Sequence, residues 1–191
     1  LTLGSVLDFQ GGTQPPRSTF LETPQDGYVR LLQIRDFEND DNAVYVREES
    51  VSGRCKTTDI MVARYGASLG RVLTGKAGAY NVALVKMLPA PARWDQRFLF
   101  HWLAGDVFQG RLRETGARSA QAGFNKADLH PTPVALPPLL EQCEVAKAVD
   151  SVMDTLAHNE SVHSHLTTVK SALMSVLLSG EVRAKPDEVT P

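Results

Sequence analysis

The stretch "ALPPLLEQCEVAKAVD", residues 135–150, divides the chain into two parts of different character. Pro137 and Pro138 lack the backbone N–H that a sheet needs, whereas proline suits the first turn of a helix. A strand-rich part therefore ends here, and a helix is predicted over 139–179, with Gly180 as its C-terminal stop. At about 1.5 Å per residue this helix would be about 60 Å long, which exceeds the span of a small domain.

Apolar residues recur along the predicted helix in the pattern of a coiled coil. Their steps are 4, 3, 4, then 6, then 4, 3, 4 and 3, which is an a/d seam with a phase slip near Asn159. An apolar stripe left in water promotes aggregation, and the chain has no second long helix to cover it. The predicted partner is therefore another chain. The predicted dimerisation residues are Val145, Val149, Val152, Leu156, Val162, Leu166, Val169, Leu173 and Val176.

The part before the prolines is predicted to be a mixed α+β domain. A helix is predicted over 93–116, where aromatic and aliphatic residues fall at helical spacing. Short runs rich in β-branched and aromatic residues, separated by glycine-rich turns, predict strands. These runs cover 28–37, 42–49, 59–66, 80–89 and 131–137. The predicted division is a domain over 1–138, a helical region over 139–180 and a tail over 181–191.

Composition indicates a water-soluble protein with an ordinary core. The chain has 191 residues, of which 42% are hydrophobic and 22% charged, and no apolar run approaches the ~20 residues of a membrane span. Cys55 and Cys143 match no zinc or redox spacing, so both are predicted to be free thiols in a reducing cytoplasm. The first residue is Leu1 rather than Met, as expected of a fragment or a trimmed chain.

Charge is unevenly distributed along the sequence. The formal net charge of −2 by itself argues against a nucleic-acid binder. Residues 50–126, however, carry 12 Lys and Arg against four Asp and Glu, whereas 36–49 and the segment after 126 are acidic. A basic segment between acidic ones predicts a surface for phosphate contact. A solvated surface with no partner is the alternative.

Motifs for catalysis are weak or missing. Residues 70–77, "GRVLTGKA", fit the phosphate-binding pattern GxxxxGK, but Ala77 replaces the hydroxyl that would hold magnesium, so a glycine-rich turn explains them better. His158 and His165 are two helical turns apart, too far for one metal ion, and with His163 they indicate solvated or seam-lining side chains. No nucleophile–base arrangement or nuclease carboxylate set is evident. The sequence therefore predicts no catalytic activity, no metal and no cofactor.

Several polar loops carry the side chains that read DNA. Arg and Lys bind guanine, Asn and Gln bind adenine, and Ser binds either at the base edges. Together with the basic middle segment and the dimerising helix, these loops indicate a protein that reads DNA sequence. The predicted DNA-binding residues are Arg17, Arg35, Arg64, Tyr65, Arg71, Arg118, Ser119, Gln121, Asn125 and Lys126.

The order of these segments resembles a specificity subunit of type I restriction–modification systems. The resemblance runs through "LGSVLDFQGGTQPP" (3–16), "VRLLQIRDF" (29–37), "TTDIMVARYGASLGRV" (57–72) and "LLSGEVR" (177–183). Its most specific part is 115–150, where a glycine-led polar loop is followed by a hydrophobic strand that ends in Pro-Pro-Leu-x-Glu-Gln and then by a long helix. The polar loop departs from the usual Gly-Thr-Gln by reading "GARSAQ".

The resemblance implies that 1–138 is a target-recognition domain and that 139–180 is a helical spacer. In that family two such helices pack antiparallel as a coiled coil and hold two recognition domains a fixed distance apart on DNA. A full member carries two of each, and this chain carries one of each. It is therefore expected to be either a natural half-subunit that forms a homodimer or an excised half. A twofold dimer would read a bipartite site with inverted, identical halves.

The implied function is that of a non-catalytic subunit bound to double-stranded DNA. It would position a DNA methyltransferase subunit, which flips out an adenine, and in a complete system a restriction subunit, at a bipartite target. Two alternatives stay open. One is a dimeric coiled-coil adaptor that does not bind DNA, which the acidic C-terminal part favours. The other is an enzyme with a degraded nucleotide loop at 70–77.

Overall fold

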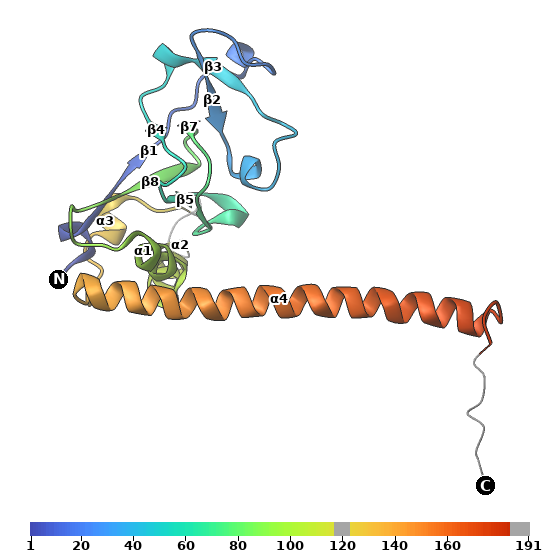
Figure 1. Ribbon diagram of the computed structural model, residues 1–191. Helices are drawn as coiled ribbons and strands as arrows, with labels where there is room; N and C mark the ends of the chain where they lie inside the picture. The colour runs from blue at the N-terminus through green and yellow to red at the C-terminus, as the bar shows by residue number, and fades with distance from the viewer. Residues whose placement is uncertain (117–122, 184–191) are drawn as a thin grey trace. The chain divides into compact units, whose positions relative to one another are not determined.

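The computed structural model describes residues 1–116 and 123–183 of the chain. It divides into two compact units, Leu1–Ala146 and Lys147–Pro191. The first unit combines two four-stranded sheets with three helices, and the second consists mainly of one helix (Figure 1). The prediction of an α+β fold with a long C-terminal helix is confirmed. None of the described helices is long and apolar enough to cross a membrane.

The first sheet has the strand order β1-β8-β5-β6 and is antiparallel throughout. The second has the order β3-β2-β7-β4, in which β2 and β7 run parallel and the outer pairs antiparallel. The strands are β1 Leu7–Gly11, β2 Tyr28–Leu32, β3 Tyr45–Arg47, β4 Arg54–Cys55, β5 Met61–Ala63, β6 Val72–Leu73, β7 Gly78–Tyr80 and β8 Leu84–Pro89. Each of the runs predicted as strands before residue 90 contains one of them, although the strands are shorter.

The core of the first unit lies in three clusters. The largest packs Phe9 and Val85 of the first sheet against Leu99, Phe108 and other side chains of the helices. A second joins the two sheets, and a third covers the second sheet with Val46 and its neighbours. Figure 1 shows the result, with α1 and α2 beside the first sheet and β2 and β3 at the other end of the unit.

The predicted helix over 93–116 is two helices, α1 Gln96–Ala104 and α2 Asp106–Gly116. The break is at Gly105, whose backbone is extended. Its carbonyl accepts the backbone N–H of Gln109 at 3.0 Å, which is the first hydrogen bond of α2. Asp95 caps α1, because its carboxylate accepts the backbone N–H groups of Arg97 and Phe98. Spacing of apolar residues alone does not reveal this break.

The predicted strand over 131–137 was wrong. This segment makes only an isolated bridge, between Thr2 and Pro133. Its prolines, at 131, 133 and 137, have no N–H to give to a sheet, so hydrogen bonding cannot continue along it. A short helix, α3 Lys126–Leu129, precedes it.

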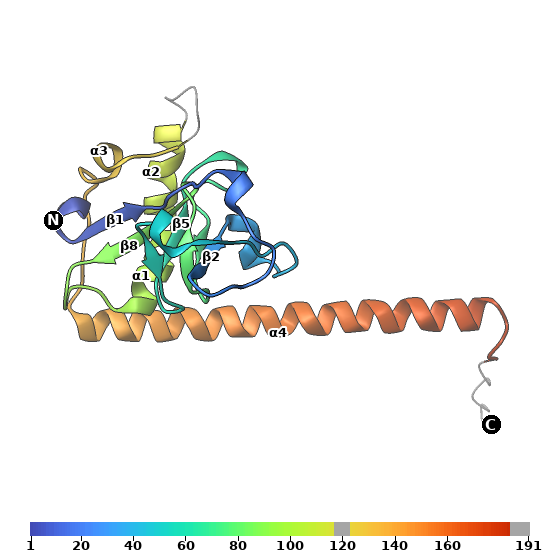
Figure 2. The same cartoon turned by 90° about the horizontal axis from the view of Figure 1, so that it is seen from above.

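The helix α4, Leu139–Leu178, is uninterrupted for 40 residues (Figure 2). It starts directly after Pro138, and Gly180 beyond its end has φ of +79°, as expected for a glycine stop. Only Gln142 and Ala146 are buried along it. The division between the units falls within α4, at 146 and 147. The domain division at 138 and 180 stays a prediction.

Candidate nucleic-acid interface

Four of the predicted DNA-binding residues gather around the segment 123–126. Arg64 and Tyr65 follow β5 directly, and Tyr65 forms an isolated antiparallel bridge with Gly123. The Arg64 guanidinium lies 5.0 Å from the centre of the Tyr65 ring, and its Nε donates to the carbonyl of Phe124 at 2.8 Å. A Cβ at Gly123 would come within 2.6 Å of the Tyr65 ring, so this close approach requires glycine.

Asn125 and Lys126 continue this segment and are both held by local contacts. Asn125 caps α3, because its side chain accepts the backbone N–H of Asp128 while the Asp128 carboxylate accepts that of Asn125. Lys126 donates to the Asp8 carboxylate at 2.7 Å and lies 5.8 Å from the centre of the Phe9 ring. Hydrogen bonding from Lys126 lowers the pKa of the Asp8 carboxyl, although burial opposes the shift. These contacts fix the backbone beside the predicted recognition loop.

Arg17 and Arg35 are exposed on short 3-10 helices, Arg17–Thr19 and Ile34–Phe37. Among the residues that the structure describes, neither makes an ion pair, and no hydrogen bond joins them to Arg64 or Tyr65. Both guanidinium groups are therefore open to an anionic partner. The prediction that they contact DNA remains a prediction.

The basic and acidic segments of the sequence do not stay apart in space. Glu38 pairs with Arg71 at 2.7 Å, and Asp40 pairs with Lys76 at 2.6 Å. Hydrogen bonds from Lys76 and then from Arg30 lower the pKa of Asp40. Glu48 likewise pairs with Arg54 at 2.9 Å. The acidic segment 36–49 thus neutralises part of the basic middle, and the basic surface is smaller than the sequence indicated.

Arg118, Ser119 and Gln121 lie outside the described residues. The structure describes the backbone on both sides of them, where α2 ends at Gly116 and the Gly123 bridge begins. Their assignment as base-reading residues remains a prediction.

The GxxxxGK stretch is not a phosphate-binding loop. It passes through β6 and leads into the strand β7 rather than into a helix, so no helix N-terminus is available to a phosphate. The Lys76 ammonium is paired with Asp40. The alternative of an enzyme with a degraded nucleotide loop therefore loses its structural support.

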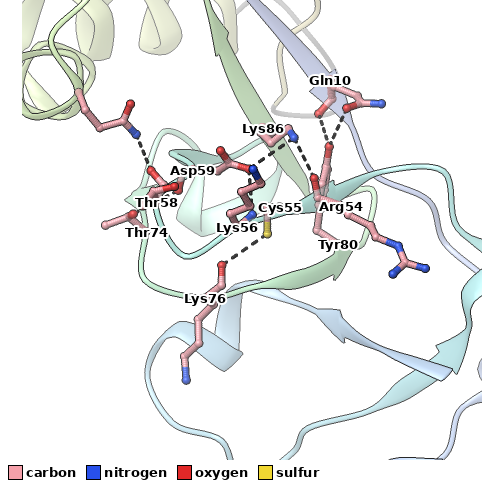
Figure 3. Close-up of polar contacts among 11 residues, drawn as sticks. Gln10, Arg54, Cys55, Lys56, Thr58, Asp59, Thr74, Lys76, Tyr80 and Lys86 are labelled. Atoms are coloured by element: carbon pink, nitrogen blue, oxygen red, sulfur yellow. Dashed lines mark hydrogen bonds and ion pairs between the residues drawn. The ribbon is translucent and has the colours of Figure 1, made fainter. Parts of the chain in front are cut away.

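Sequence reasoning missed a polar cluster between the two sheets (Figure 3). Lys86 donates to the carbonyl of Arg54 at 2.8 Å and pairs with Asp59 at 3.4 Å. The buried Cys55 thiol donates to the carbonyl of Lys76 at 3.6 Å, and burial raises the pKa of this thiol. Burial also raises the pKa of Tyr80, to about 12. The bond from Lys86 on β8 to the Arg54 carbonyl on β4 connects the two sheets, and the cluster is structural.

Cys55 is buried and Cys143 is half-buried, and no disulfide joins them in the part of the chain that the structure describes. Within the described ranges, no group of three or more His, Cys, Asp or Glu side chains could hold a metal ion. His158, His163 and His165 are exposed along α4.

The profile of the type I restriction modification DNA specificity domain matches residues 1–167. This chain belongs to that family. Specificity domains are the non-catalytic components of restriction–modification systems, so the predictions of family and of a non-enzymatic role are confirmed.

Curated relatives carry the same description. The chain is 25% identical over 136 residues to the putative type I restriction enzyme MjaX specificity subunit of Methanocaldococcus jannaschii, which covers 71% of the chain and 29% of that relative. It is 30% identical over 105 residues to the type I restriction enzyme EcoDI specificity subunit of Escherichia coli, covering 52% of the chain and 23% of the relative. The chain therefore matches less than a third of the length of each.

Solved structures share the fold. A chain from a study of complex assembly and conformational transition of the type I R-M system matches with a TM-score of 0.70 at 18% identity, covering 92% of this chain and 44% of that one. The HsdS subunit from Thermoanaerobacter tengcongensis matches with a TM-score of 0.66 at 18% identity, covering 92% and 43%. The match covers less than half of each of these two chains.

Proposed function

We propose that this chain is the DNA sequence-recognition component of a type I restriction–modification system. It would act in the cytoplasm on double-stranded DNA and position a DNA methyltransferase subunit, and in a complete system a restriction subunit, at a bipartite target. The observation that carries the proposal is the family match over residues 1–167, which includes the whole first unit and most of α4. The two curated relatives are specificity subunits by name.

The geometry supports two kinds of proposed contact, one with phosphates and one with base edges. Arg17 and Arg35 are exposed cations, suited to phosphates, which fix position without reading sequence. Tyr65 and Arg64 hold the backbone of Gly123 and Phe124, which follow residues 117–122 in the chain. Contacts with base edges are proposed for Arg118, Ser119, Gln121 and Asn125. Arg71 is paired with Glu38, and this ion pair must break before Arg71 can bind a phosphate.

The helix α4 is proposed to hold two copies together. Apolar side chains line it, and Val152 and Leu166 are 60% and 62% exposed. A homodimer would present two recognition domains and would read a site of two inverted halves.

The test is selection of bound duplexes from a randomised DNA pool, with the full chain purified together with its cognate methyltransferase. An enriched motif of two inverted, identical halves supports recognition and the homodimer together. A single half-site supports recognition by one copy and refutes the homodimer. No enrichment refutes the proposal.

One observation favours a second candidate, a coiled-coil adaptor that does not bind DNA. Ion pairs with the acidic segment neutralise Arg71, Lys76 and other cations of the basic middle. Retention of the chain on a DNA column that weakens as salt rises would exclude the adaptor, because phosphate binding releases counterions.

A further inference from the structure

The Arg64 guanidinium lies close to three separate groups of the first unit. Its Nε donates to the carbonyl of Phe124 at 2.8 Å, and its central carbon lies 5.0 Å from the centre of the Tyr65 ring. A Cβ at Gly11, at the end of β1, would lie 3.7 Å from one of its terminal nitrogens. Arg64 is half-buried, unlike the exposed Arg17. A guanidinium held in this way is suited to fixing a backbone segment.

Both partners of the bond between Arg64 and Phe124 are anchored by other contacts. Arg64 directly follows β5, and its backbone N–H donates to the carbonyl of Ala83 at 2.8 Å, just before β8. The Phe124 side chain is buried, and its ring meets the ring of Phe9 edge to face, with the two centres 5.5 Å apart. The hydrogen bond therefore joins the first sheet to a segment 60 residues farther along the chain.

Asn125 is the residue whose position this bond controls most directly. The carbonyl of Phe124 and the backbone nitrogen of Asn125 belong to one planar peptide unit, so a donor that holds the carbonyl also orients the start of Asn125. The Asn125 side chain is exposed, and its Oδ1 accepts the backbone N–H of Asp128 at 3.2 Å. Its amide nitrogen is therefore the end that can donate to the edge of a base.

We propose that Arg64 is a positioning residue for base recognition and not a phosphate contact. Its Nε holds the peptide between Phe124 and Asn125, so that the Asn125 amide meets the base edge in one orientation. Arginine suits this role because an ionised donor makes a stronger hydrogen bond than a neutral one, and its planar group stacks on the Tyr65 ring. The proposal rests on the proposed function, and it changes the role of Arg64 from a contact with DNA to the support of one.

Three substitutions of Arg64 separate the hydrogen bond from the positive charge. Arg64→Gln places its amide nitrogen as many bonds from the backbone as the arginine Nε, so it keeps the donor and loses the charge. Arg64→Lys keeps the charge but has a methylene group where the Nε was. Arg64→Met has neither donor nor charge. A positioning residue needs the donor, whereas a phosphate contact needs the charge.

DNA binding by the full chain with its cognate methyltransferase gives the first measurement. Discrimination is the ratio of the affinities for the selected duplex and for duplexes with one base pair changed. Arg64→Lys and Arg64→Met are expected to lose about tenfold in discrimination at one base pair of the half-site, with an unchanged slope of log K against log salt. Arg64→Gln should retain most of what Arg64→Met loses. Wild-type discrimination in Arg64→Lys, with the slope lowered by about 1 in Arg64→Gln and Arg64→Met, would identify a phosphate contact and overturn the proposal.

Hydrogen exchange in the free chain gives the second measurement, which does not depend on DNA. Amides of residues 123–129 should exchange about tenfold faster in Arg64→Lys and Arg64→Met than in the wild type. The matched control is Arg47→Met, because the Arg47 guanidinium also stacks on a tyrosine, 5.5 Å from the centre of the Tyr28 ring, but pairs with Glu49. This control should change neither exchange nor discrimination.

Equal exchange in all four variants would overturn the holding role of Arg64, whatever the DNA result. Enrichment of no motif by the wild type would refute the proposed function, and the exchange measurement would then decide by itself whether Arg64 holds this segment.

Discussion

Gln142 at the start of α4 and Asp95 before α1 are joined by a hydrogen bond. The Gln142 side chain is completely buried, and its Oε1 accepts the backbone N–H of Asp95 at 2.8 Å. Its Nε2 donates to the carbonyls of Arg93 and Pro137 at 2.9 and 2.8 Å. One amide thus ties the first turn of α4 to the turn before α1 and to the proline that ends the preceding segment. This is a physical role for the glutamine of the Pro-Pro-Leu-x-Glu-Gln signature.

Replacement of this amide should destabilise the first unit. Gln142→Leu removes the partner of one backbone N–H and two carbonyls at part-buried positions, and a buried group left unpaired costs about 1–3 kcal/mol. We expect the free energy of unfolding to fall by about 2–5 kcal/mol. Urea unfolding followed by fluorescence of Trp94 and Trp102 measures it. The adjacent exposed Glu141 is the control, and Glu141→Gln should change stability by less than about 0.5 kcal/mol. Equal effects of the two substitutions would refute this role.

Gly123→Ala should disturb the segment beside the recognition loop. The added Cβ would approach the Tyr65 ring to 2.6 Å, and overpacking of this kind costs about 1–3 kcal/mol. Tyr65→Ala removes the clash, so the double variant should recover part of the loss. Gly110→Ala in α2 is the control, because its Cβ meets nothing closer than 3.8 Å, and it should stabilise by up to about 1 kcal/mol. Absence of rescue by Tyr65→Ala would contradict the proposed contact.

The Asp8–Lys126 pair should contribute to stability only above acidic pH. Hydrogen bonding from Lys126 holds the pKa of Asp8 below its ordinary value of 3.8, so the stabilisation is present above that value and is lost as pH falls through the folded-state pKa. The Asp8 side chain is 47% exposed, which limits the effect to under about 1 kcal/mol. Asp8→Asn should therefore be less stable than the wild type at pH 7 and equal to it at pH 2. A constant difference across this range would exclude the linkage.

The long helix α4 was the part of the fold most readily predicted, because its sequence repeats one pattern over many residues. The prolines at 137 and 138 and the repeat that follows fixed α4 to within one residue at each end, because a 40-residue helix contains many repeats of one pattern. The break at Gly105 and the loss of the strand at 131–137 depended on single backbone groups. The glycine carbonyl that starts α2 and the prolines that cannot donate a hydrogen bond do not change the spacing of apolar residues. A prediction based on that spacing therefore cannot detect them.

Contacts between distant segments limited the prediction of the site. Sequence alone indicated arginine-bearing loops, but not that Arg64 would bind the carbonyl of Phe124, 60 residues later. Nor did it indicate that Glu38 would neutralise Arg71. Charge counted along a sequence does not report these pairings. Lys86 was missed because a single lysine within a strand carries no signal that it will bind the carbonyl of Arg54.

Alanine substitution of two arginines that are proposed to contact DNA should change DNA binding in different ways. Arg118→Ala removes a proposed contact to a base edge, which is worth about 1–3 kcal/mol of discrimination, so the selected motif should become degenerate at one position in each half. Arg17→Ala removes a proposed phosphate contact and should weaken binding to all sequences while reducing the salt slope by about 1. Arg97→Ala in α1 is the control and should leave the motif unchanged. Equal relaxation of the motif by Arg118→Ala and Arg97→Ala would refute the loop assignment.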